Sequence, residues 1–519
     1  MSSVKNSQTN SEDHQPGNPA GVFRRAHITL LGSAIGGALA IVNEILCARF
    51  LGVNTYGLYA LALILARIFE IVSIMGIPVG ALHYVSIYRA RNQSRYVLGT
   101  ILASCFPPLL AGLVFTTILW LFAPTLAADV FDNAKAGPFM QAMALAIPFM
   151  ALSEVLGSIT RGFGHAAYYV LVRNLVPPFV FLGLLLLIAS LRSDPLWVSR
   201  AFGAAYLIAA LTGVACVVKV SGRKLLRERP VFRFRELYAY SFPVLLNNML
   251  YLVVACTSIL LLGMLQNDKE VGIFRACMQI VMPFDMVVMA INAAVGHIYP
   301  VLESRHRRKE LADLVATVTR WMSMLAMGLL LIVALNRHDL LSIMGPDFVG
   351  GANTLLLLAL GQAIQGSTGS AGFLLVMSGR QKFETVNAVI AALACVILNL
   401  LLIPGYGSVG AAIATILSCL LFSVLRVTQV KRQMGIQIVR RSFLLIVALA
   451  GLTALMILLL SAYLPIGEGR GVMVMVIRMG LIATLYAALY WFIGLDHEGR
   501  QVVKNLARTY FTRQKLPSS

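Results

Sequence analysis

Residues 57–84 read GLYALALILARIFEIVSIMGIPVGALHY, a stretch apolar enough to cross a bilayer that still carries Arg67 and Glu70 near its middle. A charged side chain in the hydrocarbon region is costly unless it is paired or faces water, so such residues mark functional sites by default. At 100° per residue, Tyr59, Arg67 and Glu70 fall within about 80° of one another on a helical projection. The stretch therefore predicts a membrane-spanning helix with one polar face.

Two interpretations of Arg67 and Glu70 are open at this point. They could form a structural ion pair at i,i+3 that fixes one helix to a neighbour, or they could line a cavity. An internal repeat favours the cavity, because a shift of 215 positions aligns Gly57 with Gly272 and Glu70 with Asp285. A purely structural pair has no reason to place an acid at the same depth twice.

The composition excludes a soluble protein. The chain has 519 residues, of which 59% are hydrophobic and 12% charged, whereas soluble domains contain about 25% charged residues. Because a span needs about 20 apolar residues, the sequence predicts an all-α polytopic membrane protein with about fourteen transmembrane helices. The expected spans are 28–48, 57–82, 97–122, 139–160, 170–190, 199–218, 237–262, 271–297, 318–336, 353–377, 386–403, 408–426, 442–463 and 472–494.

The net charge of +20 reflects membrane topology and not nucleic-acid binding. Alternate loops hold 30 and 7 of the 42 Lys and Arg residues, and 5 lie within spans. An excess of basic residues marks the cytoplasmic side, so both termini are expected in the cytoplasm. The seven cysteines all lie in apolar spans without metal-ligand spacing, which predicts neither disulfides nor a metal site.

The repeat predicts the domain organisation. The same offset aligns Gly157 with Gly372 and Gly164 with Gly379, so we expect two pseudo-symmetric six-helix bundles with parallel topology. The expected segments are a disordered cytoplasmic tail (1–21), the N-terminal bundle (22–218), a basic cytoplasmic linker (219–236), the C-terminal bundle (237–430), two additional transmembrane helices (431–495) and a basic cytoplasmic tail (496–519).

Polar residues within the spans are candidates for the lining of a central cavity between the bundles. The predicted substrate-binding residues are Arg67, Arg275, Tyr59, Gln279, Asn247 and Asn248, and the predicted ion-coupling or cavity acids are Glu70, Asp285 and Glu154. Arginine binds phosphate oxygens bidentately, so one arginine from each half could hold a diphosphate. Arg173, Arg320 and Arg478 lie nearer span ends and are expected to extend towards the membrane surface. Glu44 is expected to pair with Arg49 at the interface.

No catalytic motif is present. The sequence lacks a GxxxxGK[ST] phosphate loop, HExxH and GxSxG. Its longest predicted outward loop, 123–138, is too short for a catalytic domain, which disfavours a membrane glycan polymerase or transferase. We therefore expect no cofactor and a secondary transporter that works by alternating access.

Three stretches resemble a known family. Residues 47–91 (CARFLGVNTYGLYALALILARIFEIVSIMGIPVGALHYVSIYRAR), 270–284 (EVGIFRACMQIVMPF) and 404–415 (PGYGSVGAAIAT) are similar to bacterial polysaccharide flippases of the multidrug/oligosaccharidyl-lipid/polysaccharide (MOP) exporter superfamily. The resemblance covers roughly residues 22–495 and implies a MATE-like fold with a cationic central cavity. The related lipid II flippases carry further arginines in span one. Because span one here has none deep inside it, the resemblance does not extend to a peptidoglycan precursor as substrate.

The resemblance also implies the substrate and the cellular setting. It predicts a flippase of the bacterial inner membrane that moves undecaprenyl-diphosphate-linked oligosaccharide for O-antigen (lipopolysaccharide), exopolysaccharide or teichoic-acid assembly. The expected partners are this lipid-linked glycan, membrane lipid, a coupling ion (H⁺ or Na⁺) and the glycosyltransferase and polymerase machinery. Two alternatives stay open: an ion-coupled multidrug antiporter of the same superfamily, and a membrane glycan polymerase or transferase.

Overall fold

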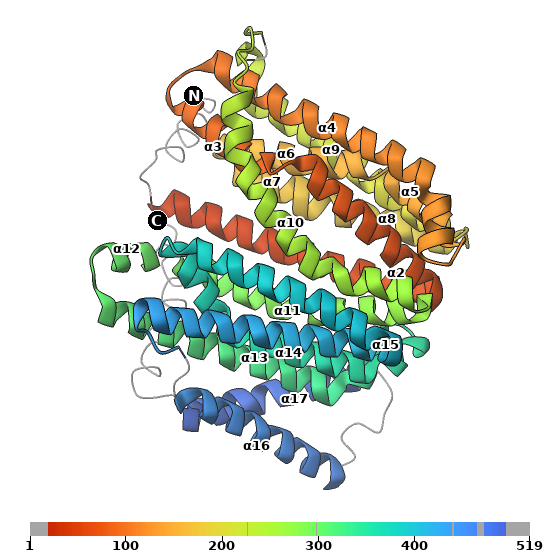
Figure 1. The fold of residues 1–519 in the computed structure, drawn as a ribbon, viewed down its shortest axis with the longest axis vertical. Coiled ribbons are helices and arrows are strands. Elements are labelled where there is room, and N and C mark those ends of the chain that lie inside the picture. The colour runs from red at the N-terminus through yellow and green to blue at the C-terminus, as the bar shows by residue number, and fades with distance from the viewer. Residues whose placement is uncertain (1–18, 226, 297, 439–440, 464–471, 495–519) are drawn as a thin grey trace, which may run out of the picture. The chain divides into compact units, whose positions relative to one another are not determined.

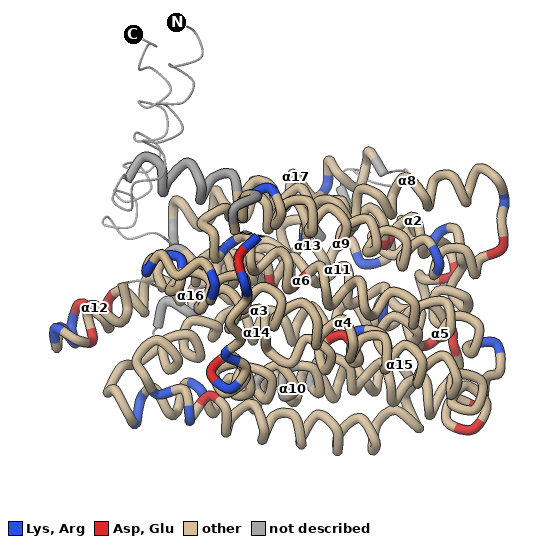
Figure 2. The backbone as a smooth tube through the Cα atoms, turned by 90° about the horizontal axis from the view of Figure 1, so that it is seen from above, with Lys and Arg blue, Asp and Glu red and all other residues tan. Residues whose placement is uncertain are grey.

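The computed structural model describes residues 19–225, 227–296, 298–438, 441–463 and 472–494, and these ranges form helices and short connections without a β-strand (Figure 1). The chain divides into two compact units, which meet between Arg275 and Ala276. We call them the N-terminal unit and the C-terminal unit and describe each by itself. Figure 2 shows that most of the helical length in either unit carries no charged residue.

The helices of the N-terminal unit are α2 (Pro19–Ile74), α3 (Ile77–Ala90), α4 (Ser94–Thr125), α5 (Ala136–Ala144), α6 (Ile147–Gly162), α7 (Ala166–Tyr169), α8 (Val176–Ser190), α9 (Leu196–Leu225) and α10 (Phe234–Leu265), with π-helical turns η1 (Leu126–Val130) and η2 (Val170–Leu175). Helix α11 (Asp268–Val295) contains the boundary between the units. The C-terminal unit continues with α12 (Ile298–Ser304), α13 (Arg308–Met344), the 3₁₀ turn η3 (Pro346–Gly351), α14 (Ala352–Met377), α15 (Gln381–Met434), α16 (Arg441–Tyr463), α17 (Val472–Leu489) and the π-helical turn η4 (Tyr490–Gly494).

All fourteen predicted spans have a helical counterpart. Within the described residues, ten helices are long and apolar enough to cross a membrane. Two of these each join two predicted spans across a kink, at Gly52 in α2 (φ 70°) and at Gly407 in α15 (φ 54°). Helices α10 and α16 supply the remaining two spans, so the protein is a multi-pass membrane protein with the predicted all-α fold.

The backbone preserves the 215-residue repeat. Gly164 and Gly379, which the offset aligns, have φ angles of 82° and 74°, and Arg192 and Gly407 have φ angles of 50° and 54°. Left-handed backbone is uncommon outside glycine, so the two matches at one offset reflect two copies of one chain path. The pseudo-symmetry that the sequence predicts is thus visible in backbone geometry.

A reciprocal glycine contact joins α2 to the start of α11 within the N-terminal unit. A Cβ atom on Gly57 would collide with the carbonyl oxygen of Asp268, and one on Gly272 would collide with the carbonyl oxygen of Val53. The repeat offset carries Val53 onto Asp268 and Gly57 onto Gly272. The two halves of the contact are therefore made by equivalent residues of the two repeats. Only glycine permits backbones to approach this closely.

The segment 227–233, which connects α9 to α10, is fastened to the N-terminal unit. The Val231 amide donates a hydrogen bond to the Arg95 carbonyl (3.1 Å), and the Arg233 guanidinium lies 5.0 Å from the centroid of the Tyr96 ring. At the start of α10, Glu236 accepts hydrogen bonds from Arg233 and from the Tyr88 hydroxyl (2.9 Å). The predicted linker 219–236 is thus helical at both ends and has a short docked centre.

The reciprocal glycine contact predicts that the addition of a single methyl group at either glycine lowers the stability of the protein. We expect Gly272→Ala to lower stability by about 1–3 kcal/mol because the added methyl meets a backbone carbonyl that cannot rotate away. The matched control is Gly183→Ala in α8, where nothing lies within 4 Å of the new Cβ. The control is expected to be neutral or stabilising by roughly 0.5–1 kcal/mol. Thermal unfolding of both purified variants in detergent measures the difference; equal melting temperatures would contradict the contact.

Glu236 predicts a pH-dependent term in stability. The Arg233 guanidinium, and after it the Tyr88 hydroxyl, hold the pKa of the Glu236 carboxyl below its ordinary value. A lowered pKa in the folded state gives stability that is present above the unfolded value of about 4.3 and is lost as pH falls through the folded value. We expect wild type to melt above Glu236→Gln at pH 7 and the gap to close in acid below about pH 4. A gap of constant size across this range would show that the carboxylate charge is not involved.

Candidate functional site: intramembrane ion pairs

The N-terminal unit brings three of the predicted site residues together in one network, the Arg67 cluster (Arg67, Glu70, Glu154, Arg173 and Tyr206). Arg67 Nη1 lies 2.8 Å from Glu70 Oε2, and Arg173 Nη2 lies 3.8 Å from the other oxygen of Glu70. Arg173 also forms an ion pair with Glu154. The Tyr206 hydroxyl accepts hydrogen bonds from Arg67 (3.2 Å) and Arg173 (3.3 Å). Every charged member therefore has an oppositely charged partner.

Four elements position the Arg67 cluster. Arg67 and Glu70 project from one face of α2, as the helical projection predicts, and Glu154 and Tyr206 come from α6 and α9. Arg173 lies in the π-helical turn η2, directly before Pro177 and Pro178. Prolines have no N–H to bond the preceding turn, and π-turns rotate the side chains that follow from their α-helical directions. The local sequence thus favours the irregular turn that carries Arg173.

Arg173 is a member of the Arg67 cluster that the sequence analysis did not predict. It was expected to extend towards the membrane surface, but its side chain is only 22% exposed and bridges Glu70 and Glu154. The doublet Pro177–Pro178 just after it is the available signal, because it predicts a break in α-helical geometry beside a charge. In contrast, the Arg67 side chain is 33% exposed, the most accessible charged group of the cluster.

A second network, the Arg275 cluster (Glu44, Tyr56, Tyr59 and Arg275), lies beside the reciprocal glycine contact. Arg275 Nη2 is 2.6 Å from Glu44 Oε1, and the Tyr56 hydroxyl donates to Glu44 Oε2 (2.6 Å). Tyr59, which is 2% exposed, stacks on Tyr56 with ring centroids 6.2 Å apart. Tyr59 therefore packs against Tyr56, while Arg275 and Glu44 form the ion pair of the cluster. Glu44, expected at the interface, is the acid that binds this arginine.

Both clusters are electrically balanced when ionised, because the first contains two arginines and two glutamates and the second one of each. Removing charges from water is expensive, and an isolated buried charge would cost several kcal/mol more than a paired one. Each arginine of the two clusters therefore lies beside a carboxylate that neutralises its charge.

The remaining predicted residues are spread over α10 and α11. Asn248 is half-buried on α10, and the side chain of Asn247 lies outside the described part of the chain. In the C-terminal unit, Gln279 is half-buried on α11, and Asp285 Oδ2 lies 3.5 Å from Gln362 Nε2. Four acids lie deep in the spans: Glu44, Glu70, Glu154 and Asp285. Among the described residues, the first three have an arginine partner, whereas Asp285 has the Gln362 amide.

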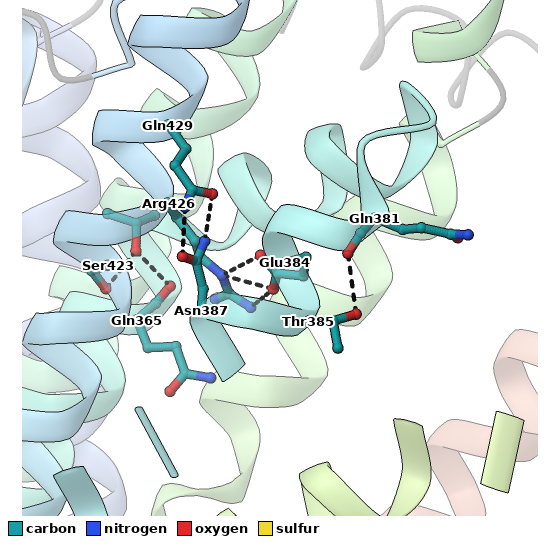
Figure 3. Close-up of polar contacts among 9 residues, drawn as sticks. Gln365, Gln381, Glu384, Thr385, Asn387, Ser423, Arg426 and Gln429 are labelled. Carbon is teal, nitrogen blue, oxygen red and sulfur yellow. Dashed lines mark hydrogen bonds and ion pairs between the residues drawn. The ribbon is translucent and has the colours of Figure 1, made fainter. Parts of the chain in front are cut away.

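The C-terminal unit also contains a polar ladder that the sequence analysis did not identify. Its rungs are Gln365–Cys419, Thr368–Ser423, Glu384–Arg426 and Asn387–Gln429. Figure 3 shows the last two of these pairs. Arg426 also lies over the Phe422 ring, 3.5 Å from its centroid. The ladder fastens both halves of α15 to each other and to α14. Polar residues spaced three or four apart in α15 are the signal for it.

Comparisons with known proteins agree with this architecture. The sequence profile described as "Polysaccharide biosynthesis protein" matches residues 22–306, and the profile described as "MatE" matches residues 243–402. "Stage V sporulation protein B" of Bacillus subtilis (strain 168) is 26% identical over 124 residues. That match spans only about a quarter (24%) of the length of this curated relative and 24% of the present chain.

Two solved structures have a similar fold. "Lipid II flippase MurJ, inward closed conformation" superposes with a TM-score of 0.70 and 12% identity, over 89% of this chain and 98% of that one. A multidrug resistance MATE family transporter of the MOP superfamily, in an inward-facing conformation, superposes with a TM-score of 0.66 and 11% identity, over 79% and 98%. At these identities the likeness concerns the fold alone. Since the first profile covers more than half of the sequence, the chain belongs to the polysaccharide biosynthesis protein family.

Proposed function

We propose that the protein translocates undecaprenyl-diphosphate-linked oligosaccharide from the cytoplasmic to the periplasmic leaflet of a bacterial inner membrane by alternating access. The glycan would serve O-antigen, exopolysaccharide or related surface-polymer synthesis, with both termini of the transporter in the cytoplasm. The observation that carries the proposal is that a chain of this family holds two arginines inside the membrane, each oriented by a carboxylate.

The chemistry of guanidinium supports a phosphate-bearing substrate. An arginine offers five N–H donors in a planar fork that matches phosphate oxygens. At Arg67, one terminal nitrogen donates to Glu70 and the other donates to Tyr206. The Arg67 side chain is nevertheless 33% exposed. The carboxylate thus fixes the fork in place while leaving donors for a diphosphate.

Charge balance supports ion coupling. The ionised Arg67 cluster is neutral, so a bound diphosphate would add uncompensated negative charge in a region of low dielectric. Uptake of one proton by Glu70 or Glu154 would cancel one of the two negative charges of the diphosphate and release an arginine from its pair. Asp285, which has an amide partner, is the acid best suited to bind the coupling ion, because a carboxylate in this environment needs a proton or a cation. We assign H⁺ as the ion, with Na⁺ as the alternative.

A multidrug antiporter of the same superfamily is the second candidate, and the match of the MatE profile to residues 243–402 favours it. A cationic drug would bind the carboxylates of the clusters and leave the arginines as a structural complement. The two functions therefore make opposite demands on the arginines, and removal of the arginines separates them. Under the first proposal the transporter would hand its cargo between the glycosyltransferases and the polymerase of the pathway.

Removal of either arginine is expected to slow glycan translocation strongly. We expect Arg67→Ala and Arg275→Ala, in proteoliposomes, to reduce flipping of undecaprenyl-diphosphate oligosaccharide by roughly tenfold or more, since a hydrogen bond to a charged group contributes about 1.5–3 kcal/mol. Lectin accessibility of the labelled glycan measures flipping. The matched control is Arg305→Ala, which changes an exposed arginine of the connection after α12.

A structural role of Arg67 would give a different result. Loss of Arg67 would leave Glu70 with only the longer contact to Arg173 (3.8 Å), and a buried carboxylate that loses its main partner destabilises the fold. The double variant Arg67→Ala/Glu70→Gln removes both charges and should restore folding without restoring translocation. Recovery of transport in this double variant, or drug efflux without glycan flipping in wild type, would overturn the proposed substrate.

Asp285 is expected to connect transport to the proton gradient. We expect Asp285→Asn to bind lipid-linked glycan normally but to lose acceleration by an imposed pH gradient, because the amide cannot exchange a proton. Asp285→Glu should retain a gradient response. Flipping rates at fixed Na⁺, with and without the pH gradient, measure the effect; an unchanged gradient response in Asp285→Asn would remove this residue from coupling, and a response to Na⁺ alone would identify the other ion.

A further inference from the structure

The C-terminal unit contains a cavity of about 380 Å³ that no part of the proposed transport cycle uses. Helices α13, α14 and α15 form its walls, with Ile438 and with Ile446 of α16. Its volume is in the range of small-molecule sites, which is about 300–1,000 Å³. The helices are membrane-spanning, so the surroundings from which a ligand would enter this cavity are lipid.

The lining of the cavity changes along its length. Ala316 and Arg320 of α13 and residues 427–428 of α15 line one end, while Met327 and Leu420 line the other. The first end is basic, because Arg320 lines it and the exposed Lys431 and Arg432 follow one turn later on α15. The second end is apolar. An occupant that matches this gradient has an anionic head and a hydrocarbon chain.

Hydroxyl groups lie between the two ends. Thr319 is hydrogen-bonded to Ser370 (2.6 Å), Ser367 donates to a backbone carbonyl, and Thr368 donates to Ser423 (2.8 Å; Ser423 is labelled in Figure 3). Ser323 is different: it is 1% exposed, it lines the cavity, and its Oγ has no hydrogen-bond partner within the described residues. A buried hydroxyl without a partner is costly and calls for a polar group from outside the chain.

We propose that this cavity is a binding site for an anionic glycerophospholipid. One acyl chain occupies the apolar end beside Met327 and Leu420, an ester oxygen accepts a hydrogen bond from Ser323, and the phosphate lies at Arg320. By the predicted topology the basic end is on the cytoplasmic side, so the lipid comes from the inner leaflet, where acidic headgroups attract basic residues. The bound lipid joins α13 and α15 to the start of α16.

A phospholipid fits the cavity better than the lipid-linked glycan does. The cavity offers one arginine within an otherwise uncharged lining, and its hydroxyls are mostly satisfied by each other, so little remains for a diphosphate with attached sugars. The proposal therefore does not depend on which glycan the protein carries. It concerns a lipid that stays bound and stabilises the C-terminal unit.

The test measures lipid retention by the full-length protein. Purified protein in detergent is titrated with phosphatidylglycerol, with phosphatidylcholine and with undecaprenyl phosphate, and bound lipid is counted by native mass spectrometry. We expect one tightly held phosphatidylglycerol and a rise in melting temperature that phosphatidylcholine does not give. Arg320→Gln should weaken phosphatidylglycerol binding about tenfold, whereas the control Arg305→Gln should leave it unchanged.

A second variant keeps the proposal testable if Arg320→Gln does not fold. Ser323→Leu fills the cavity and removes the hydroxyl without a change of charge, and it should abolish the tightly held lipid and its effect on the melting temperature. Retention of phosphatidylglycerol by Ser323→Leu would overturn the site. Binding of undecaprenyl phosphate in place of phosphatidylglycerol, with the same sensitivity to Ser323→Leu, would overturn the assignment of the lipid class.

Discussion

The structure depends on the rule that an arginine inside a membrane needs a carboxylate within reach. Arg67 has Glu70, Arg173 has Glu154, and Arg275 has Glu44. These pairs make it possible to keep permanently charged groups at a depth where an isolated charge would destabilise the helix that carries it. They also leave the arginines oriented, because a side chain held at one nitrogen has lost most of its rotamer freedom before any ligand arrives. Under the proposed function, stability and substrate recognition would depend on the same bonds.

The two copies of the repeat have kept their backbone and changed their charges. A Cβ atom on Gly157 would lie 3.0 Å from the Tyr169 ring, and one on Gly372 would lie 2.8 Å from Glu384, the residue twelve positions later in both cases, and 2.6 Å from Arg426. The contact is conserved between copies although an aromatic ring has been exchanged for a carboxylate. Close packing requires a glycine at this position, but it limits only the size of the neighbouring side chain and not its chemistry. Asymmetric chemistry can therefore develop on a symmetric frame, as the arginine-paired Glu70 and the amide-paired Asp285 show.

The sequence predicted the parts of this protein that follow from local pattern. Apolar length determined the spans, and the shared helical face of Arg67 and Glu70 follows from their spacing of three residues. It did not predict the partner of Arg275, because Glu44 lies 231 residues away and only packing brings them together. Arg173 was misjudged for a local reason: the π-helical turn before Pro177 redirects a side chain that ideal helix geometry places elsewhere. The cavity beside Ser323 was also beyond prediction, since its volume is what three helices leave unfilled.

The glycine contact between α2 and α11 has a consequence for how this gene can change. At most buried sites, an enlarged side chain can be compensated by a second mutation that shrinks its neighbour. At Gly57 and Gly272 the neighbour is a main-chain carbonyl, which every amino acid carries, so no second-site substitution can create room. After duplication, neither copy could therefore change its glycine codon at this contact, and directed evolution of the protein should leave Gly57 and Gly272 unchanged while neighbouring positions vary.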